Sequence, residues 1–308
     1  MTNILVLAEA LNGVTHWRAF QPFAALRRAN RDLNFTFKDR NVTMTDIRFS
    51  DLVIAYRPSD KAVLSLIEAA KSSGVPVVVD CDDDLLNMPP THPLYHDYEA
   101  NRSVFIEGCA MADRVWTSTT ELLFVCDAMD GRGQVVPNSV TERDLPPAPA
   151  PWRGEFTWRG SSHHIADVLA HADWYERSRS LANRWIFKGY FPPLNHYGNA
   201  TTERWEKNTD AYFAALARRG VNVVWKPLAE TQFNKSKSNI AWIEATMGGG
   251  CCVTNFAGRE GWEYAMPDFP RSGEEVAEAW KASREDVLRN YNLADANAKR
   301  LQTIRELT

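Results

Sequence analysis

The segment from Asn234 to Thr254 carries residues whose types and order could bind a phosphorylated ligand. A polar turn of Ser236, Lys237 and Ser238 comes just before an apolar helical stretch. The start of a helix has unpaired N–H groups and partial positive charge, so it favours an anion. Glu244 lies about two turns further on, where its carboxylate could accept hydrogen bonds from the two hydroxyls of a ribose. The spacing predicts a nucleotide-sugar site, and a capped helix with a surface glutamate explains it equally well.

A second polar loop, GSSHH at residues 160–164, follows a predicted strand. The backbone N–H groups of a glycine turn at this point can closely approach a phosphate. The alternative is a helix capped by Ser162, with exposed histidines. A metal site made by His163 and Asp167 would need a third ligand nearby, and the sequence offers none. We therefore predict no metal here.

Lys226 is a candidate phosphate contact. It follows a predicted strand at 221–225, and ligands of open α/β sheets bind at the carboxyl ends of the strands. A solvated lysine at the end of a strand is the alternative.

An acidic run at residues 80–84 follows the apolar sequence VPVVV. Packing like charges together costs stability unless they meet a cation, a ligand rich in donors or an arginine. Three interpretations are open. Asp80 and Asp82 could bind a metal, as in a phosphohydrolase. The run could instead bind the hydroxyls of an acceptor and supply a catalytic base, or it could be a solvated loop.

The elements that must position these residues alternate between strands and helices, which favours α/β architecture with doubly wound parallel sheets. A proline-rich stretch, LPPAPAPW at 145–152, interrupts the alternation and reads as an extended linker. The pattern restarts after it, which predicts two domains. The predicted units are residues 1–140, a linker at 141–153, a second domain at 154–290 and a terminal helix within 291–308. The predicted elements include strands at 3–10, 52–56 and 155–159, and helices at 61–72, 201–219, 273–289 and 293–307.

Four motifs together resemble the GT-B glycosyltransferases, in particular the group 1/family 4-like branch common in bacteria and phages. They are VPN at 136–138, GSSHH, Lys226-Pro227-Leu228, and FNKSKSN at 233–239 followed by Trp242, Glu244, Ala245 and Gly248. They occur in family order and span most of the chain. The resemblance implies two Rossmann-like domains facing a central cleft, with the last helix packing back onto the first domain.

The same resemblance assigns the donor site. Glu244 would hold the nucleotide ribose, and the turn of Ser236, Lys237 and Ser238 would meet the diphosphate. Gly160, Ser161 and His164 would face the diphosphate or the transferred sugar, and Lys226 would lie beside them. Many relatives carry a glutamate where this chain has Ser236, so the role of that glutamate is not carried over.

In the first half, Trp17-Arg18 with Pro22 resembles a family loop that would bring Arg18 to the cleft, ready to meet a phosphate or the acidic run. Arg57 is a similar cleft candidate, and surface salt bridges are the alternative for both. Relatives show a comparable acidic run, so we favour the cleft role for it. Asp80 and Asp82 would be buried partners and Asp83 would lie at the acceptor, with Asp82, Asp83 and His164 as the catalytic candidates.

The expected activity is therefore transfer of a sugar from a nucleotide-sugar donor, UDP-glucose or similar, to an acceptor hydroxyl, with no tightly bound cofactor and no required metal. The resemblance to phage-encoded members suggests 5-hydroxymethylcytosine in double-stranded DNA as acceptor. That acceptor requires base flipping and a basic track. The candidates for this basic track are Arg27, Arg28, Arg31, Lys38 and Arg40.

The alternative functions are cell-surface or lipid-linked glycan synthesis, a Mg²⁺-dependent phosphohydrolase and a non-catalytic binding module.

The amino-acid composition limits the class of protein and the kinds of partner. The 308 residues suffice for two cores, and 44% hydrophobic with 24% charged residues is ordinary for a globular protein. A net charge of −4 gives no global attraction to nucleic acid. Two of the five cysteines are adjacent, which does not suggest a disulfide framework. We expect a cytoplasmic protein, in the host cytoplasm if phage-encoded, that is a monomer or weak dimer and does not bind membranes.

Overall fold

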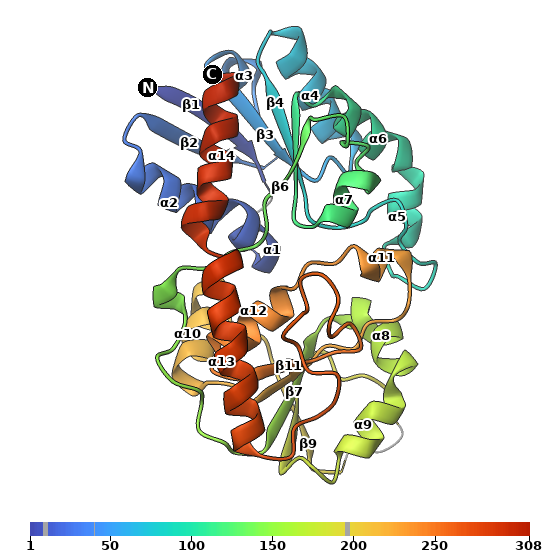
Figure 1. The fold of residues 1–308 in the computed structure, drawn as a ribbon. Coiled ribbons are helices and arrows are strands. Elements are labelled where there is room, and N and C mark those ends of the chain that lie inside the picture. Colours follow the sequence, from blue (N-terminus) through green and yellow to red (C-terminus); the bar gives the residue numbers. More distant parts are fainter. Residues whose placement is uncertain (9–11, 40, 195–197) are drawn as a thin grey trace.

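Two parallel sheets, each flanked by helices, make up the protein (Figure 1). The structure, a computed structural model, describes residues 1–8, 12–39, 41–194 and 198–308. The first sheet has the order β2-β1-β3-β4-β5-β6, and the second has the order β11-β10-β7-β8-β9. The first comprises β1 (Thr2–Leu7), β2 (Leu33–Lys38), β3 (Leu52–Tyr56), β4 (Val77–Cys81), β5 (Arg114–Thr117) and β6 (Gly133–Val135). The second comprises β7 (Glu155–Gly160), β8 (Arg184–Gly189), β9 (Ala200–Glu203), β10 (Val223–Trp225) and β11 (Cys251–Val253).

Helices cover both faces of each sheet. Those of the first half are α1 (Gly13–Thr15), the π-helical turn η1 (His16–Phe20), α2 (Gln21–Ala29), α3 (Met44–Arg48), α4 (Lys61–Ser72), α5 (Tyr95–Ala100), α6 (Arg102–Met111) and α7 (Thr120–Val125). The 3₁₀ turn η2 (Glu142–Asp144) lies between the two halves. Those of the second half are the 3₁₀ turn η3 (Ser162–His164), α8 (Ile165–Ala170), α9 (Ala172–Ser178), α10 (Thr209–Arg219), α11 (Gln232–Lys235) and α12 (Ile240–Met247). Two long helices, α13 (Gly273–Asn290) and α14 (Leu293–Leu307), end the chain.

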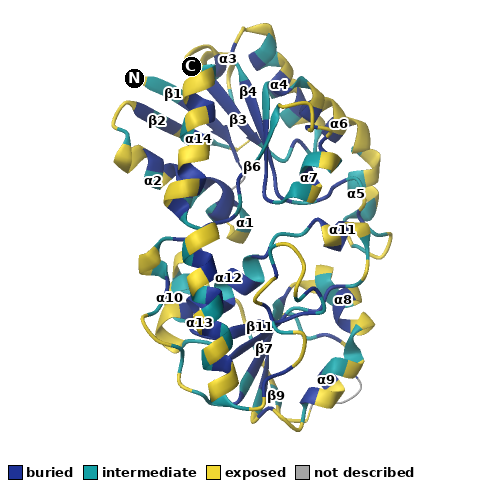
Figure 2. Ribbon diagram, in the orientation of Figure 1, coloured by how far each residue is buried: buried dark blue, intermediate teal, exposed yellow. Residues whose placement is uncertain are grey.

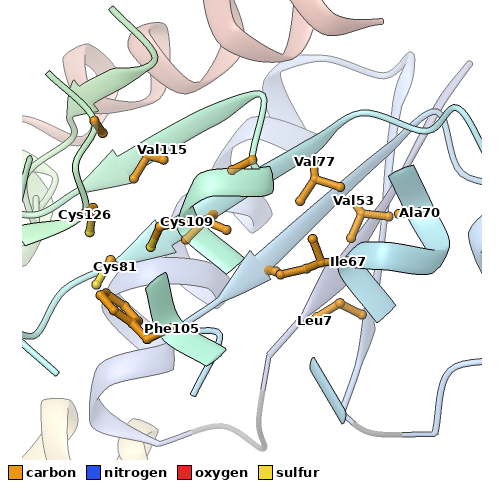
Figure 3. Packing of buried hydrophobic residues seen from close by; sticks show 14 of the residues in the cluster. Leu7, Val53, Ile67, Ala70, Val77, Cys81, Phe105, Cys109, Val115 and Cys126 are labelled. Carbon is orange, nitrogen blue, oxygen red and sulfur yellow. The ribbon is translucent and has the colours of Figure 1, made fainter. Parts of the chain in front are cut away.

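The inner strands of the first sheet, β1, β3, β4 and β5, are largely buried on both faces, and Figure 2 shows most of their length in dark blue. Successive side chains of a strand point to opposite faces, so each strand contributes to two cores. Leu5 and Leu7 of β1 pack into one cluster, and Ile4 and Val6 pack into the other. Figure 3 shows part of the first cluster. All five cysteines of the chain are free and buried, and Cys81, Cys109 and Cys126 pack in this cluster.

The chain crosses between the two halves twice, at neighbouring points. The first crossing follows β6, and the second joins α13 to α14. At these points Val140 accepts a hydrogen bond from Leu293 N (2.8 Å) and donates one to Tyr291 O (2.9 Å). Ala296 and Ile304 of α14 then pack into the core of the first sheet beside α2. Figure 1 shows α13 and α14 running along one side of both halves. The exact domain limits given above remain a prediction.

Most predicted elements agree with the structure to within a few residues, and the helix at 61–72 agrees fully. Its start is fixed by Asp60, whose carboxylate accepts a hydrogen bond from Val63 N at 3.0 Å. The predicted helix at 201–219 is wrong in its first part. Residues 200–203 form β9, and the helix starts only at Thr209, capped by Asn208. The predicted strand at 3–10 ends at Leu7, and residues 9 and 10 lie outside the described part.

Among the described residues, no helix combines the length and the apolar character needed to cross a membrane.

Candidate active site

Two adjoining cavities of about 650 Å³ and 390 Å³ lie between the two halves of the protein. Both are lined by residues from the carboxyl ends of the strands. Tyr56 and Arg57 come from the first sheet, and Arg159 and Gly160 come from the second. This is the edge at which ligands bind in open α/β sheets. The two cavities share Val14, Arg57, Arg159, Ser161, His164, Trp205, Ile240 and Glu244.

Glu244 lines both cavities and is held in place by two neighbours. Its Oε2 accepts a hydrogen bond from the Tyr212 hydroxyl at 2.7 Å and lies 3.3 Å from Arg159 Nη2. Burial raises the pKa of Tyr212 well above its ordinary value, so its hydroxyl remains a donor. The carboxylate is therefore fixed with one oxygen committed to the protein. Neither Arg159 nor Tyr212 was predicted, although Arg159 directly precedes the GSSHH loop.

The turn before α12 divides into buried and accessible residues. Lys237 and Ser238 line the smaller cavity. Lys237 Nζ lies 3.6 Å from Asp83 Oδ1 and 4.0 Å from the centre of the Phe233 ring. Ser238 Oγ accepts a hydrogen bond from Asn138 Nδ2 at 3.0 Å.

Ser236, by contrast, is fully buried. Its hydroxyl donates to Asp84 Oδ2 at 3.2 Å and lies 3.3 Å from Gln232 O. A side chain without exposed surface cannot contact a donor. The prediction of Ser236 as a donor-binding side chain is therefore corrected.

His164, Asp167 and Lys226 form a connected group at the cavity wall. His164 Nδ1 lies 3.0 Å from Asp167 Oδ2, and its Nε2 lies 3.5 Å from Lys226 Nζ. Lys226 and burial lower the pKa of His164 to about 4, and the ring is therefore neutral at pH 7. Burial and the nearby Lys237 lower the pKa of Lys226 to about 8. Burial alone would raise the pKa of Asp167, but the bond with His164 and the charge of Lys226 hold it at about 2.

Asp167 also joins the GSSHH loop to the segment that leads into α12. Its Oδ1 accepts hydrogen bonds from Asn234 Nδ2 at 2.6 Å and from Ala229 N at 2.9 Å. His163 faces the first half instead, with its ring 5.0 Å from that of His92. The residues that the sequence assigned to the donor therefore surround one space, apart from Ser236. Among the described residues, no three His, Cys, Asp or Glu side chains are grouped so that they could hold a metal ion.

The carboxylates of Asp80 and Asp82 are each engaged by an arginine. Asp80 Oδ1 accepts from Arg18 Nη2 at 2.6 Å and from Nε at 3.1 Å. Asp82 Oδ1 accepts from Arg57 Nε and from the Tyr56 hydroxyl, both at 2.6 Å. The first of these pairs is buried on both sides, because the Arg18 and Asp80 side chains are 0% and 3% exposed. Arg18 thus meets a carboxylate, as one branch of the prediction held, but it cannot reach a phosphate. The Arg18–Asp80 pair lies beneath the cavity and does not line it.

Asp83 lies closer to the ligand space. It lines the smaller cavity, 3.4 Å from Arg57 Nη2, and it reaches Lys237 of the second half. Burial would raise its pKa, but Lys237 and Arg57 lower it below the ordinary value. Arg57 itself has a φ of +44°, in the left-handed region. That conformation costs a non-glycine residue about 1–3 kcal/mol and tends to occur at functional sites.

The four described residues of the predicted basic track do not line the two cavities. Arg27 and Arg28 lie in the last turn of α2, and Arg31 follows that helix. The next residue, Asp32, accepts a hydrogen bond from Thr2 N at the start of β1, whereas the cavity lies at the end of β1. Lys38 is paired with Asp46 at 2.7 Å. Arg40, the fifth residue of the track, lies outside the described residues.

No family model matches the sequence, and no curated protein matches it. Several solved structures resemble the fold over nearly the whole chain. HepE from Anabaena in complex with UDP-glucose has a TM-score of 0.65 at 12% identity, over 99% of this chain and 100% of that one. The catalytic domain of starch synthase IV from Arabidopsis thaliana, bound to ADP and acarbose, has a TM-score of 0.61 at 7% identity, over 99% of both chains. An α-glucosyltransferase in complex with UDP and a 13-mer DNA has a TM-score of 0.55 at 11% identity, over 97% of this chain and 94% of that one.

The chain has the GT-B fold. This confirms the predicted fold class, with two Rossmann-like halves whose strand ends face a common cleft. In this GT-B fold the GSSHH loop, Lys226, Lys237 and Glu244 come from the second half, and Arg57 and the acidic run come from the first. At these low identities the likeness gives the fold alone, so the activity must be argued from the side chains.

Proposed function

We propose that this GT-B protein is a glycosyltransferase that moves a sugar from a nucleotide-sugar donor, UDP-glucose or a similar UDP-sugar, to an acceptor hydroxyl. The observation that carries the proposal is the set of groups around the interdomain cavities. A fixed carboxylate, Glu244, lies on the same wall as two lysines, Lys226 and Lys237, and as the Ser161 turn. A carboxylate can accept hydrogen bonds from the two hydroxyls of a ribose, and the lysines and the turn can bind a diphosphate.

The donor would lie along the second half of the protein. Glu244 has one oxygen engaged by Tyr212 and Arg159, and its other oxygen would accept hydrogen bonds from the ribose hydroxyls. Lys226, Lys237 and the start of α12 bind the diphosphate, where positive charge and N–H groups converge. The structures of HepE and of the α-glucosyltransferase contain UDP-glucose and UDP, which supports a uridine nucleotide as the first donor to test.

Catalysis would rest on stabilising the leaving diphosphate. Breaking the bond between the sugar and the phosphate places negative charge on the departing oxygen. Lys226 and Lys237 both line the smaller cavity, where they would meet that charge, and preorganised charge is usually the largest single contribution to catalysis. His164 is neutral and held by Asp167, so it can accept a hydrogen bond without adding charge.

Asp83 is the proposed base for the acceptor hydroxyl. In the free protein Lys237 and Arg57 keep it ionised. A bound diphosphate would draw Lys237 toward itself, which removes part of the positive field at Asp83 and raises its pKa. A carboxylate with a raised pKa accepts a proton more readily. Asp82 accepts hydrogen bonds from Tyr56 and Arg57, and it thereby positions Arg57 beside Asp83.

The acceptor predicted from the sequence, 5-hydroxymethylcytosine in DNA, is one candidate within this proposal, and cell-surface or lipid-linked glycans are another. The α-glucosyltransferase whose structure contains DNA is the observation in favour of a DNA acceptor. Against it, Arg27, Arg28 and Arg31 lie at the end of the first sheet away from the cavity.

The phosphohydrolase alternative loses its proposed ligands. Asp80 is paired with Arg18 in a buried site, and Asp82 is engaged by Arg57 and Tyr56. A divalent ion would have to displace both arginines. The pairing of both carboxylates thus argues against a metal-dependent phosphohydrolase.

The test is a UDP-release assay with UDP-glucose, UDP-galactose and UDP-N-acetylglucosamine, each with and without an acceptor mixture, in EDTA. We expect at least one donor to be turned over, and Glu244→Gln and Asp83→Asn to lose most of that turnover. If no UDP-sugar is consumed and none binds, the proposal fails.

A further inference from the structure

The first-half side of the larger cavity is mainly apolar. Leu7 at the end of β1, Val14 on α1, Val63 and Leu66 on α4, and Tyr98 on α5 all line it. We call these five residues the apolar wall. None of them was singled out from the sequence, because the functional motifs lie elsewhere.

The apolar wall is a fixed surface. Val63 and Leu66 are three residues apart and therefore lie on the same face of α4. The start of that helix is fixed by its Asp60 cap, and both side chains are half-buried and pack on the core beneath the wall. Tyr98 packs on the same core. Each of these residues thus presents part of its surface to the cavity while the rest is immobilised, as is usual in small-molecule sites.

The charges on this side do not suit an anion. Among the described residues that line the first-half side of the larger cavity, Arg57 is the one cation. It already contacts Asp82 at 2.6 Å and Asp83 at 3.4 Å. Two carboxylates, Asp39 and Asp60, line the same side. A phosphate or carboxylate placed here would meet like charge without a free cation, which is unfavourable in a partly desolvated site.

The wall also faces the proposed donor. The same cavity is lined on its other side by Gly160, Ser161, His164 and Glu244. A molecule seated on the wall therefore borders the place where the sugar would be transferred, and Asp83 lies in the adjoining cavity that shares Arg57. The total volume of about 650 Å³ can hold a donor sugar and a compact acceptor.

We infer that the apolar wall is the acceptor subsite and that it accepts an uncharged alcohol or phenol on an apolar carbon skeleton. This inference rests on the glycosyltransferase function proposed above and adds the class of acceptor. In the reaction, the acceptor oxygen forms the new bond to the sugar carbon, the bond from that carbon to the diphosphate breaks, and the acceptor proton passes to Asp83.

The test uses two acceptors that share one skeleton and differ in charge. These are 2-naphthol and 6-hydroxynaphthalene-2-sulfonate, each offered with the UDP-sugar that the protein binds most tightly by calorimetry. We expect the naphthyl glycoside by mass spectrometry, with kcat/KM for 2-naphthol about tenfold or more above that for the sulfonate. A hydroxymethylcytosine oligonucleotide is the third acceptor.

Variants of the wall separate acceptor binding from donor binding. Leu66→Asp should lower kcat/KM for 2-naphthol about tenfold or more and leave the Kd of UDP within about twofold. Val63→Thr keeps the shape of the side chain and should lower kcat/KM for 2-naphthol about threefold. This variant provides the test if Leu66→Asp does not fold. Ser65→Asp, at an exposed position of the same helix, is the matched control and should change neither value.

The outcomes distinguish this inference from the proposed function. Turnover of the sulfonate at the rate of 2-naphthol, unchanged kcat/KM in both wall variants, or glycosylation of the oligonucleotide alone would overturn the inference. UDP-sugar binding without transfer to any neutral alcohol would also overturn it and leave the donor site standing. Failure to bind any UDP-sugar would instead overturn the proposed function.

Discussion

Asp83 of the first half and Lys237 of the second lie 3.6 Å apart across the cleft, and both line the smaller cavity. They belong to the two segments of the sequence with the most charged and polar candidate site residues, the acidic run at 80–84 and the turn at 236–238 before α12. The contact thus joins the proposed acceptor base to a proposed phosphate ligand. A ligand that occupies Lys237 would change the electrostatic field at Asp83, which couples donor binding to the state of the base.

Replacing Glu244 by glutamine should weaken UDP binding. The change keeps the shape and removes the charge that would accept hydrogen bonds from the ribose, worth about 1.5–3 kcal/mol or about ten- to a hundredfold in Kd. Calorimetry with UDP measures it. Glu230→Gln is the matched control, because Glu230 is exposed and paired with Arg259. An E244Q variant that binds UDP within twofold of the wild type would remove the basis of the donor assignment.

The affinity for UDP should fall above pH 8. The pKa of Lys226 in the free protein is lowered to about 8 by burial and by Lys237, and a bound diphosphate would raise it. Between these two pKa values each pH unit costs up to about tenfold in affinity for UDP, because the neutral Lys226 amine must take up a proton on binding. Titrations from pH 7 to 9.5 should show this decline.

Lys226→Arg provides the control for that titration, since a guanidinium keeps its charge over the whole range. Its UDP affinity should be nearly independent of pH. Parallel pH profiles for the wild type and the variant would show that Lys226 does not contact the diphosphate.

Arg18→Met should destabilise the protein by about 3–5 kcal/mol, because it leaves the Asp80 carboxylate buried without its partner. The double variant with Asp80→Asn removes both charges and should recover a large part of the loss. Urea unfolding of the single and double variants measures both effects. A loss below about 1 kcal/mol for R18M would mean that the pair is solvated and accessible after all.

Arg300 of α14 gives a useful contrast. It is fully buried, and burial together with Arg18 lowers its pKa to about 9. Its Nε and Nη2 have no hydrogen-bond partner among the described groups. The charge is therefore poorly compensated, and Arg300→Met should cost less than R18M or be neutral in the same urea series.

Phe233 should hold the two halves together. It belongs to the second half but packs in the core of the first sheet, while Trp17 of the first half packs in the core of the second. Phe233→Ala should lower the unfolding free energy by about 3–5 kcal/mol and speed proteolysis of residues 229–239. Phe124→Ala, at a side chain 60% exposed, is the control. Equal proteolysis rates for the two variants would contradict this role.

The sequence predicted the central strands well but missed two of the edge strands, β2 and β9, for a physical reason. β3, in the interior of its sheet, is a continuous apolar run because both of its faces are buried. β2 and β9 lie at the edges of their sheets. The sequence of β9, ATTE, is polar, and its strand character depends on pairing with β8, so the pattern suggested a helix there.

The site divides in a similar way. Loop residues beside strand ends, such as Ser161 and Lys226, could be placed from the sequence because the carboxyl edge of a sheet is a known location for ligands. The burial of Ser236 and Arg18 could not be predicted, because it depends on Asp84 and Asp80, partners that only the folded chain brings near. Tyr212 was missed for the same reason, since its hydroxyl meets Glu244 across 32 residues of sequence.

The most direct test of a nucleotide-sugar site in the interdomain cleft is calorimetric titration of UDP into the wild-type protein in EDTA, with Glu244→Gln alongside. We predict one UDP per chain without any divalent ion, and at least tenfold weaker binding by the variant, about 1.4 kcal/mol. Binding that requires Mg²⁺, binding that is equal in the two proteins, or no binding at millimolar UDP would contradict the account.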